Sequence, residues 1–271
     1  MSRLAVIGEN LQHKKGAEQM DLGLKGKRAI VTGGSRGIGR AIAEHLADEG
    51  VSVAICARKS DGLQEAVSAL QAKGVSVFSK VVDVSKAEEY KTFITEAAEA
   101  LGGLDIFVHN VSAMVGQGEE GWMKSFQIDM MGAVRGVEAA QPYLEKSQAG
   151  SVIFIGTTAA VESFGPPNPY SAMKLALVAY TNDLGQALAR KGIRVNTISP
   201  GSIYFEGGAW DRVEKGMPDY FERVKKSIPF GRYGTPEEVA RVVVFMASPA
   251  ASWVTGTHVI VDGGQHKGVD A

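Results

Sequence analysis

The stretch Ala29-Ile30-Val31-Thr32-Gly33-Gly34-Ser35-Arg36-Gly37-Ile38-Gly39-Arg40 decides the fold of this chain. An apolar run leads into a loop with four glycines, and a helical pattern follows from Ala41. Glycine lets the backbone turn tightly and leaves no Cβ between the main chain and a bound anion. The first N–H groups of the next helix then point at that anion, and the helix dipole favours negative charge there. The loop therefore predicts a phosphate cradle for a dinucleotide, although a glycine-rich loop alone is a weak signal.

Composition fits one α/β domain with a sizeable core, since 45% of the 271 residues are hydrophobic. The net charge of −1 gives no sign of a nucleic-acid-binding surface. The single cysteine, Cys56, excludes an intrachain disulfide and a cysteine-based zinc cluster, and its apolar neighbours indicate a buried small hydrophobe. The five histidines show no metal-ligand spacing, so we expect no metal site.

The N-terminal segment carries no targeting signal that we can identify. Residues 1–21 lack the apolar core of a signal peptide, and no apolar run approaches the ~20 residues of a membrane span. We expect a cytoplasmic protein with no membrane partner. Residues 1–23 are interpreted as an extension that lies on the surface or on a neighbouring subunit, or is partly disordered, and residues 24–271 as a single domain.

Short β-rich apolar runs alternate with longer helical patterns along the chain. The predicted strands are 28–32, 51–57, 75–82, 104–108, 151–155, 194–198 and 258–261. The predicted helices are 38–49, 61–72, 85–101, 119–146, 169–190 and 235–246, with a less regular segment before the last. Such a series of β-α-β units predicts an α/β fold with a doubly wound, Rossmann-like parallel sheet of about seven strands and helices on both faces. Ligands of such sheets bind at the carboxyl ends of the strands.

The second strand ends in Ala57-Arg58-Lys59, where sites that prefer NAD usually place an acidic residue. Arg58, together with Arg36 in the glycine loop, can offer a planar guanidinium to a 2′-phosphate. We therefore predict NADP(H) over NAD(H). The alternative, that Arg58 and Lys59 are solvated loop cations, remains open. Asp61 lies past the strand end and is expected to start the next helix.

Two further polar residues follow predicted strands. Asp83 can accept a hydrogen bond from an adenine amino group, or it can cap the helix that follows. Asn110 can line the same site or simply make a turn.

The segment Tyr170-Ser171-Ala172-Met173-Lys174 is the sharpest chemical signal. Residues four apart on a helix share a face, so the phenol and the ammonium can meet a common ligand. A phenol has an ordinary pKa near 10, and a nearby cation lowers this pKa toward useful acid–base chemistry. The preceding strand ends in Gly156-Thr157-Thr158, whose hydroxyls can polarise a substrate carbonyl.

Together these motifs resemble those of the short-chain dehydrogenase/reductase family, over roughly residues 24–264. The matching motifs are Thr32-Gly33-xxx-Gly37-x-Gly39, Tyr170-xxx-Lys174, Pro200-Gly201, Pro229-Phe230-Gly231-Arg232, Thr255-Gly256 and Asp262-Gly263-Gly264. The resemblance implies a nicotinamide cofactor, hydride transfer between a ketone and a secondary alcohol, and a homotetramer or dimer. It also implies that Tyr170 is the acid/base, that Lys174 tunes its pKa and binds the nicotinamide ribose, and that Ile203 lies beside the carboxamide.

The residues predicted to bind the cofactor come from five loops and the start of one helix. They are Gly33, Ser35, Arg36, Gly37, Ile38, Arg58, Asp83, Val84, Asn110, Tyr170, Lys174, Pro200, Gly201 and Ile203. The predicted catalytic residues are Tyr170, Lys174, Thr157 and Asp129.

Four departures from the family pattern bear on turnover. Thr157 stands in place of the family's serine, and the Asn-Asn-Ala-Gly after the fourth strand reads His109-Asn110-Val111-Ser112. The threonine that often follows Pro-Gly is replaced by Tyr204-Phe205. Asp129 replaces an asparagine whose backbone carbonyl helps to organise a proton-relay water. Its side chain either places negative charge near Lys174 or is a packed, hydrogen-bonded helix residue.

These departures motivate a competing hypothesis, a cofactor-binding sensor or assembly subunit with little turnover. Residues 202–226 are the predicted substrate lid. Its apolar residues Trp210, Met217, Tyr220 and Phe221 suit a hydrophobic substrate, but surface packing or subunit contact would explain them as well.

Overall fold

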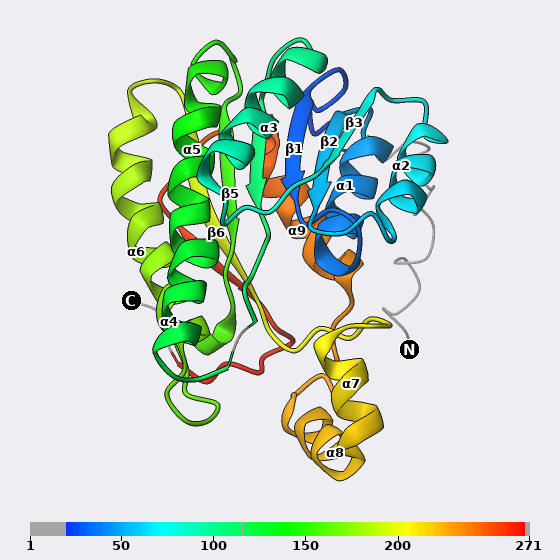
Figure 1. Cartoon of the computed structure of the whole chain (residues 1–271), viewed down its shortest axis with the longest axis vertical. Coiled ribbons are helices and arrows are strands. Elements are labelled where there is room, and N and C mark those ends of the chain that lie inside the picture. Colours follow the sequence, from blue (N-terminus) through cyan, green and yellow to red (C-terminus); the bar gives the residue numbers. More distant parts are fainter. Residues whose placement is uncertain (1–19, 115, 269–271) are drawn as a thin grey trace, which may run out of the picture.

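The computed structural model describes residues 20–114 and 116–268, and its centre is a parallel sheet (Figure 1). The sheet has seven strands in the order β3-β2-β1-β4-β5-β6-β7. They are β1 (Arg28–Thr32), β2 (Ser52–Ala57), β3 (Val77–Val81), β4 (Ile106–His109), β5 (Ser151–Ile155), β6 (Arg194–Pro200) and β7 (His258–Val261). The predicted doubly wound α/β fold is thus confirmed.

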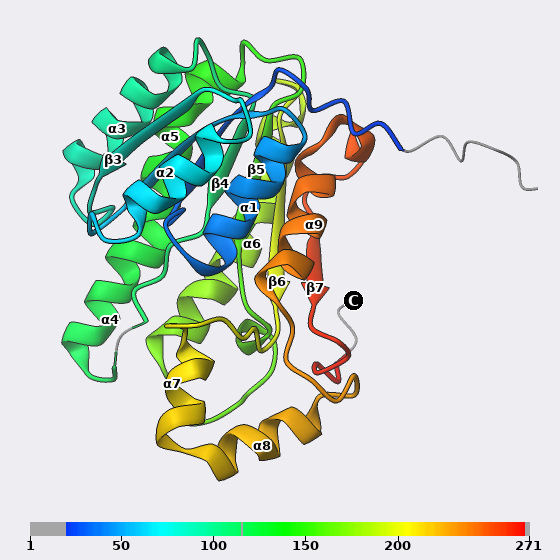
Figure 2. The same cartoon turned by 90° about the vertical axis from the view of Figure 1, so that its right-hand side faces the viewer.

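Helices cover both faces of the sheet (Figure 2). The first layer contains α1 (Gly37–Asp48), α2 (Leu63–Gln71) and α9 (Pro236–Ala247), and the second contains α3 (Ala87–Ala100), α5 (Met131–Leu144) and α6 (Pro169–Ala189). Successive strand side chains point to opposite faces, so Ala29 and Val31 belong to the core under the first layer, while Ile30 belongs to the second. Burial on both faces explains why these strands read as continuous apolar runs.

The long helix predicted over residues 119–146 is one helical column with a wider turn inside it. It consists of α4 (Glu119–Ser125), a π-helical segment (Phe126–Met130) and α5. A π-helical turn is rare and often occurs at a functional site. Here it contains Asp129, whose side chain is completely buried.

The segment expected to be less regular folds into two helices, α7 (Ala209–Gly216) and α8 (Pro218–Ser227), which form an arm beyond the sheet (Figure 1). The rings of Phe221 and Tyr233 stack at 4.5 Å, and Trp210 lies 4.9 Å from Tyr233. Trp210 and Phe221 thus pack into the arm's own small core. This packing supports the surface-packing alternative for these two residues.

The N-terminal extension falls mainly on residues 1–19, which lie outside the described residues. Cys56 is 1% exposed, and burial raises the pKa of its thiol to about 12. In the described part of the chain, no helix combines the length and apolarity that a bilayer crossing requires, and no group of three potential metal ligands occurs.

Candidate active site

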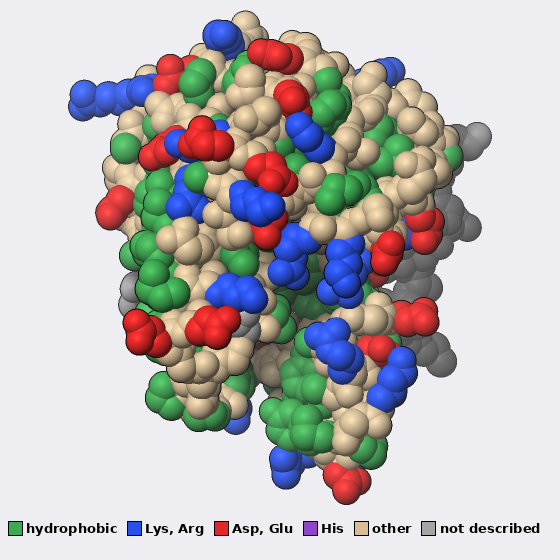
Figure 3. Space-filling model, viewed as in Figure 1, with side chains coloured by type: hydrophobic (Ala, Val, Ile, Leu, Met, Phe, Trp, Pro, Cys, Tyr) green, Lys and Arg blue, Asp and Glu red, His purple; other side chains and the backbone are tan. Residues whose placement is uncertain are grey.

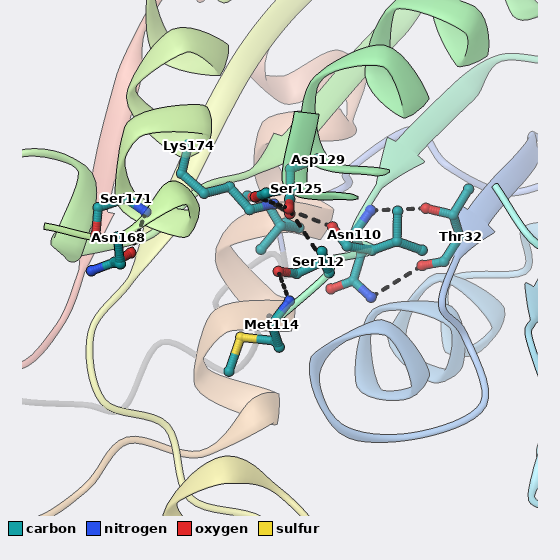
Figure 4. A network of polar contacts seen from close by, with 12 residues as sticks. Thr32, Asn110, Ser112, Met114, Ser125, Asp129, Asn168, Ser171 and Lys174 are labelled. Carbon is teal, nitrogen blue, oxygen red and sulfur yellow. Dashed lines mark hydrogen bonds and ion pairs between the residues drawn. The ribbon is translucent and has the colours of Figure 1, made fainter. Parts of the chain in front are cut away.

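The glycine loop lies where the order of the strands reverses, between β1 and β4. Asn110, directly after β4, fixes the two strand ends to each other. Its backbone N–H donates to Thr32 Oγ1 at 2.9 Å, and its Nδ2 donates to the carbonyls of Thr32 and Gly33 at 3.0 and 3.3 Å (Figure 4). Open α/β sheets bind ligands at this switch point. Asn110 is therefore a support of the loop rather than a mere turn residue.

The geometry of the loop suits a phosphate group. A Cβ on Gly39 would stand 2.3 Å from both the Gly33 carbonyl oxygen and Asn110 Nδ2, so only glycine allows the loop to meet the helix this closely. Among the described α-helices, side chains cap only the starts of α6 and α9, so α1, like the other helices, has no side-chain cap. The N–H groups of the first turn of α1 thus have no side-chain acceptor, which is what a site for an anion at a helix start requires.

The two candidate 2′-phosphate ligands have different surroundings. Arg58 is exposed at the end of β2, and its charge acts on Asp83 at the end of β3. Arg36 is exposed in the loop, and its Nη1 donates to the Gly207 carbonyl at 3.2 Å.

Asp83 closes a turn ahead of α3, because its Oδ1 accepts from Ser85 N at 3.0 Å and Ser85 Oγ at 2.7 Å. Burial alone would raise the pKa of Asp83, but these hydrogen bonds and the charges of Arg58 and Lys86 bring it below its ordinary value. Asp83 thus does not cap α3, whose N-cap residue is Lys86 and has no side-chain cap, while the adenine contact of Asp83 stays a prediction. The neighbouring Val84 is 2% exposed, and its predicted cofactor contact stays a prediction as well.

Tyr170 and Thr157 are brought together from α6 and the end of β5. Asn168 Oδ1 accepts from Ser171 N at 3.0 Å and so fixes the start of α6, and Thr157 Oγ1 accepts from Ala159 N at 3.2 Å. The Thr157 hydroxyl lies near enough to the partly buried phenol of Tyr170 to act on its pKa. Burial is the main cause that raises the pKa of Tyr170 above its ordinary value, and Asp129 adds to it, while Thr157 opposes it.

The expected lowering of the Tyr170 pKa by Lys174 is wrong for this structure. Lys174 is 2% exposed, and its Nζ donates to the carbonyls of Ile155 at 2.9 Å and Val111 at 3.2 Å. The same Nζ lies 3.5 Å from Asp129 Oδ1 (Figure 4). Two of the three ammonium donors thus have carbonyl partners, while Asp129 Oδ1 faces the ammonium as an ion pair without a hydrogen bond. Tyr170 and Lys174 share a face of α6, as the spacing predicts, but the long side chain of Lys174 ends at two backbone carbonyls and at Asp129.

Both alternatives for Asp129 hold at once. Its Oδ2 accepts from Ser125 Oγ at 2.7 Å and from Ala113 N at 3.3 Å, as a packed helix residue would. Its Oδ1 faces Lys174 in a buried ion pair. Burial lowers the pKa of Lys174, and Asp129 opposes this shift. The buried His109 lies near this pair, and burial followed by the Lys174 charge lowers the pKa of its imidazole to about 3.

The loop after β6 is held by a residue that the sequence did not single out. Gln265 Oε1 accepts from Ser202 N at 2.9 Å, and its Nε2 donates to Ser202 Oγ at 3.0 Å. A Cβ on Gly201 would collide with Asp262, which explains the glycine. Ile203 is buried and pairs with Gly234. An isolated glutamine after Gly-Gly gives no signal in the sequence.

A cavity of about 680 Å³ adjoins Tyr170. Its apolar wall includes Trp122, Phe164 and Leu175, which come from α4, the loop after β5 and α6 and are each more than 40% exposed. Figure 3 shows a hollow between the lobe that carries α4 and the arm of α7 and α8, with Lys and Arg side chains along its upper edge.

A doubly wound sheet with a glycine loop at its switch point defines a Rossmann-type nucleotide-binding protein. Residues 33–266 match the family model described as enoyl-(acyl carrier protein) reductase. The isoepoxydon dehydrogenase of Aspergillus clavatus is 40% identical over 250 residues, covering 90% of this chain and 96% of that protein. The dehydrogenase/reductase SDR family member 4 of Oryctolagus cuniculus is 37% identical over 249 residues, covering 89% and 94%.

Among solved structures, the L-sorbose reductase of Gluconobacter frateurii, complexed with NADPH and L-sorbose, superposes with a TM-score of 0.85 at 32% identity. The match covers 92% of this chain and all of that one. The chain belongs to the short-chain dehydrogenase/reductase family. It is an oxidoreductase whose fold binds a nicotinamide cofactor.

Proposed function

We propose that this protein is an NADP(H)-dependent oxidoreductase that interconverts a ketone and a secondary alcohol, with Tyr170 as the acid/base. The observation that carries the proposal is the Tyr170–Thr157 hydroxyl pair beside the 680 Å³ cavity. The 2′-phosphate preference rests on Arg36 and Arg58 and on the absence of an acidic residue at Ala57. The structural relative solved with NADPH supports the same cofactor.

The cofactor residues divide by the part of the dinucleotide that they would hold. Gly33, Ser35, Gly37 and Ile38 would hold the phosphates, while Asn110 fixes their loop. Asp83 and Val84 would meet the adenine, and Arg36 and Arg58 the 2′-phosphate. Pro200, Gly201 and Ile203 would meet the nicotinamide, with Tyr170 and Lys174 on the ribose side.

Side chains of this protein supply the proton that the carbonyl oxygen takes up during reduction. When bound, the nicotinamide supplies the hydride at the carbonyl carbon or takes it up in the reverse direction. Tyr170 gives its phenolic proton to the carbonyl oxygen during reduction, and the Thr157 hydroxyl donates a hydrogen bond to that oxygen. Since the pKa of Tyr170 is raised, the phenol holds its proton at neutral pH, which is the form that reduction requires. Asp129 and Lys174 hold a fixed pair of charges behind this site.

The test is an NADPH-oxidation screen against a panel of ketones that includes L-sorbose, with isoepoxydon tested in the oxidative direction with NADP⁺, as the relatives' names suggest. We expect Tyr170→Phe to lower kcat by roughly 10³-fold while the Kd for NADPH changes by less than about twofold. Full activity of Tyr170→Phe would overturn the proposed mechanism.

The occupied donors of Lys174 favour a second candidate, a cofactor-binding sensor or assembly subunit with little turnover. This candidate predicts that NADPH raises the melting temperature while no ketone in the panel is reduced. Turnover of any ketone at ordinary enzymatic rates would exclude it.

We also propose that the chain forms a homo-oligomer, a dimer or a tetramer. In the described part of the chain, β7 is the last strand at its side of the sheet, and Trp253 in the turn before it is 99% exposed. An exposed edge and a fully exposed indole favour contact with another chain. Light scattering of the wild-type protein and of Trp253→Ser tests this, since a monomeric wild-type protein would contradict it.

A further inference from the structure

The segment after Pro200-Gly201 lies on the phosphate cradle itself. We name residues 204–208 the strap. Three ring carbons of Phe205 lie within 2.5 to 2.9 Å of the point where a Cβ on Gly37 would stand. Gly37 is the first residue of α1, so the Phe205 ring covers the start of the helix whose free N–H groups form the cradle.

Hydrogen bonds fasten the strap to both of its neighbours. Arg36 Nη1 from the glycine loop and Arg212 Nη1 from α7 donate to the same Gly207 carbonyl, at 3.2 and 3.0 Å. Within the strap, Gly208 N donates to the Phe205 carbonyl at 3.0 Å. The strap is therefore a link between the glycine loop and the arm.

The Phe205 ring fills the space on the side of Gly37 where a Cβ would stand. Not even a methyl group would fit there without displacing Phe205. We propose that the strap is a gate over the cradle, so that the diphosphate of a dinucleotide and the Phe205 ring compete for the same place. Cofactor entry moves the ring off Gly37 and releases the strap. This inference rests on the proposed dinucleotide-binding function.

Arg36 gives the gate a preference between cofactors. In the closed state its guanidinium is bound to a neutral carbonyl. A 2′-phosphate is a charged acceptor, and a charge-assisted bidentate bond is stronger than a bond to a neutral oxygen. NADP(H) therefore opens the strap more completely than NAD(H), because only NADP(H) offers Arg36 a better partner than Gly207.

Amide hydrogen exchange on the full-length wild-type protein tests the direction of the movement. Peptides over residues 33–40 report whether the cofactor is seated, and peptides over residues 204–212 report the strap. With saturating NADP⁺ we expect slower exchange in the loop and faster exchange in the strap, with a smaller change in the strap at saturating NAD⁺. Slower exchange in the strap would show that it closes over the cofactor, and unchanged exchange would show that it does not move; either result overturns the gate.

Calorimetric titration with NADP⁺ provides a second measurement. If the open state is about a tenth of the population, Phe205→Ala tightens the apparent Kd by about tenfold, because the apparent affinity scales with the competent fraction. Phe245→Ala is the control outside the strap: it removes a ring on α9 that is 38% exposed, and the Kd of this variant for NADP⁺ should stay unchanged. Weaker binding by Phe205→Ala overturns the gate while leaving the proposed function intact. Absence of NADP⁺ binding by all three proteins would overturn the proposed function itself and the gate with it.

Discussion

Replacement of Asp129 by asparagine tests the electrostatics of the site most directly. The variant removes the charge that faces Lys174 at 3.5 Å and restores the residue type of the family at this position. Asparagine keeps an oxygen for the donors Ser125 Oγ and Ala113 N. The change is therefore close to a removal of one charge.

The distance between Lys174 and Asp129 and their burial set the size of the expected loss in stability. At 3.5 Å and an effective dielectric constant of ~20, two unit charges attract by about 5 kcal/mol. Both side chains are at most 2% exposed, and loss of one partner of such a buried pair typically costs about 3–5 kcal/mol. Since the asparagine oxygen remains, we expect a loss of about 3 kcal/mol in the free energy of unfolding, or roughly 6–12 °C in Tm.

The loss depends on pH in a predictable direction. Burial already lowers the pKa of Lys174, and Asp129 opposes this shift, so the pKa falls further in the variant. At pH values between the pKa of Lys174 in the folded protein and its pKa in the unfolded chain, the unfolded chain binds more protons than the folded protein. The free energy of unfolding therefore rises with pH in this range. The deficit of Asp129→Asn should shrink as the pH rises from neutral toward the ordinary lysine pKa.

Urea unfolding followed by circular dichroism, at neutral pH and at about pH 9.5, measures both effects. Ser125→Ala is the matched control, because it removes a hydrogen bond to Asp129 but leaves the ion pair, and should cost about 1 kcal/mol without alkaline recovery. Wild-type stability of Asp129→Asn at neutral pH, or a deficit that does not shrink at alkaline pH, would refute this account of the pair.

Two further predictions concern the cofactor and the substrate. Arg58→Asp should shift the ratio of NADP⁺ to NAD⁺ affinities toward NAD⁺ by at least about tenfold in calorimetric titrations, because it adds a ribose acceptor and repels a 2′-phosphate; an unchanged ratio would contradict the role given to β2. Thr157→Val should lower kcat by about 100-fold with little change in the Kd for NADPH, while Thr157→Ser keeps most of the activity. Equal kcat values for these two variants would show that the hydroxyl has no part in turnover.

The parts of the fold that the sequence predicted are those dictated by local chemistry. The strands at 28–32, 151–155 and 258–261 have the predicted bounds, because their apolar runs meet polar or glycine residues at both ends. The arm was missed because α7 and α8 are short and take their stability from packing against Tyr233, which lies further along the chain.

The contacts within the candidate site could not be predicted from the sequence. The four-residue spacing placed Tyr170 and Lys174 on one helix face, but it cannot say where a long, flexible side chain ends. Lys174 ends on two carbonyls and Asp129, all outside α6. Phe205 was noted only as a substitution, since its contact with Gly37 joins segments far apart in the sequence.

The contacts of Lys174 and the burial of Tyr170 also bear on whether the phenol of Tyr170 is protonated. The charge of Lys174 is engaged by Asp129 and two carbonyls, so it does not draw the proton from Tyr170. Burial and the Asp129 charge both favour the protonated phenol, and they outweigh the opposing effect of Thr157. A protonated phenol can protonate a carbonyl oxygen at once, whereas alcohol oxidation needs the phenolate. The rate of reduction should therefore stay level from neutral pH until the phenol titrates, while the rate of oxidation rises with pH. If Tyr170 acts as proposed, we therefore expect ketone reduction to be the faster direction at neutral pH.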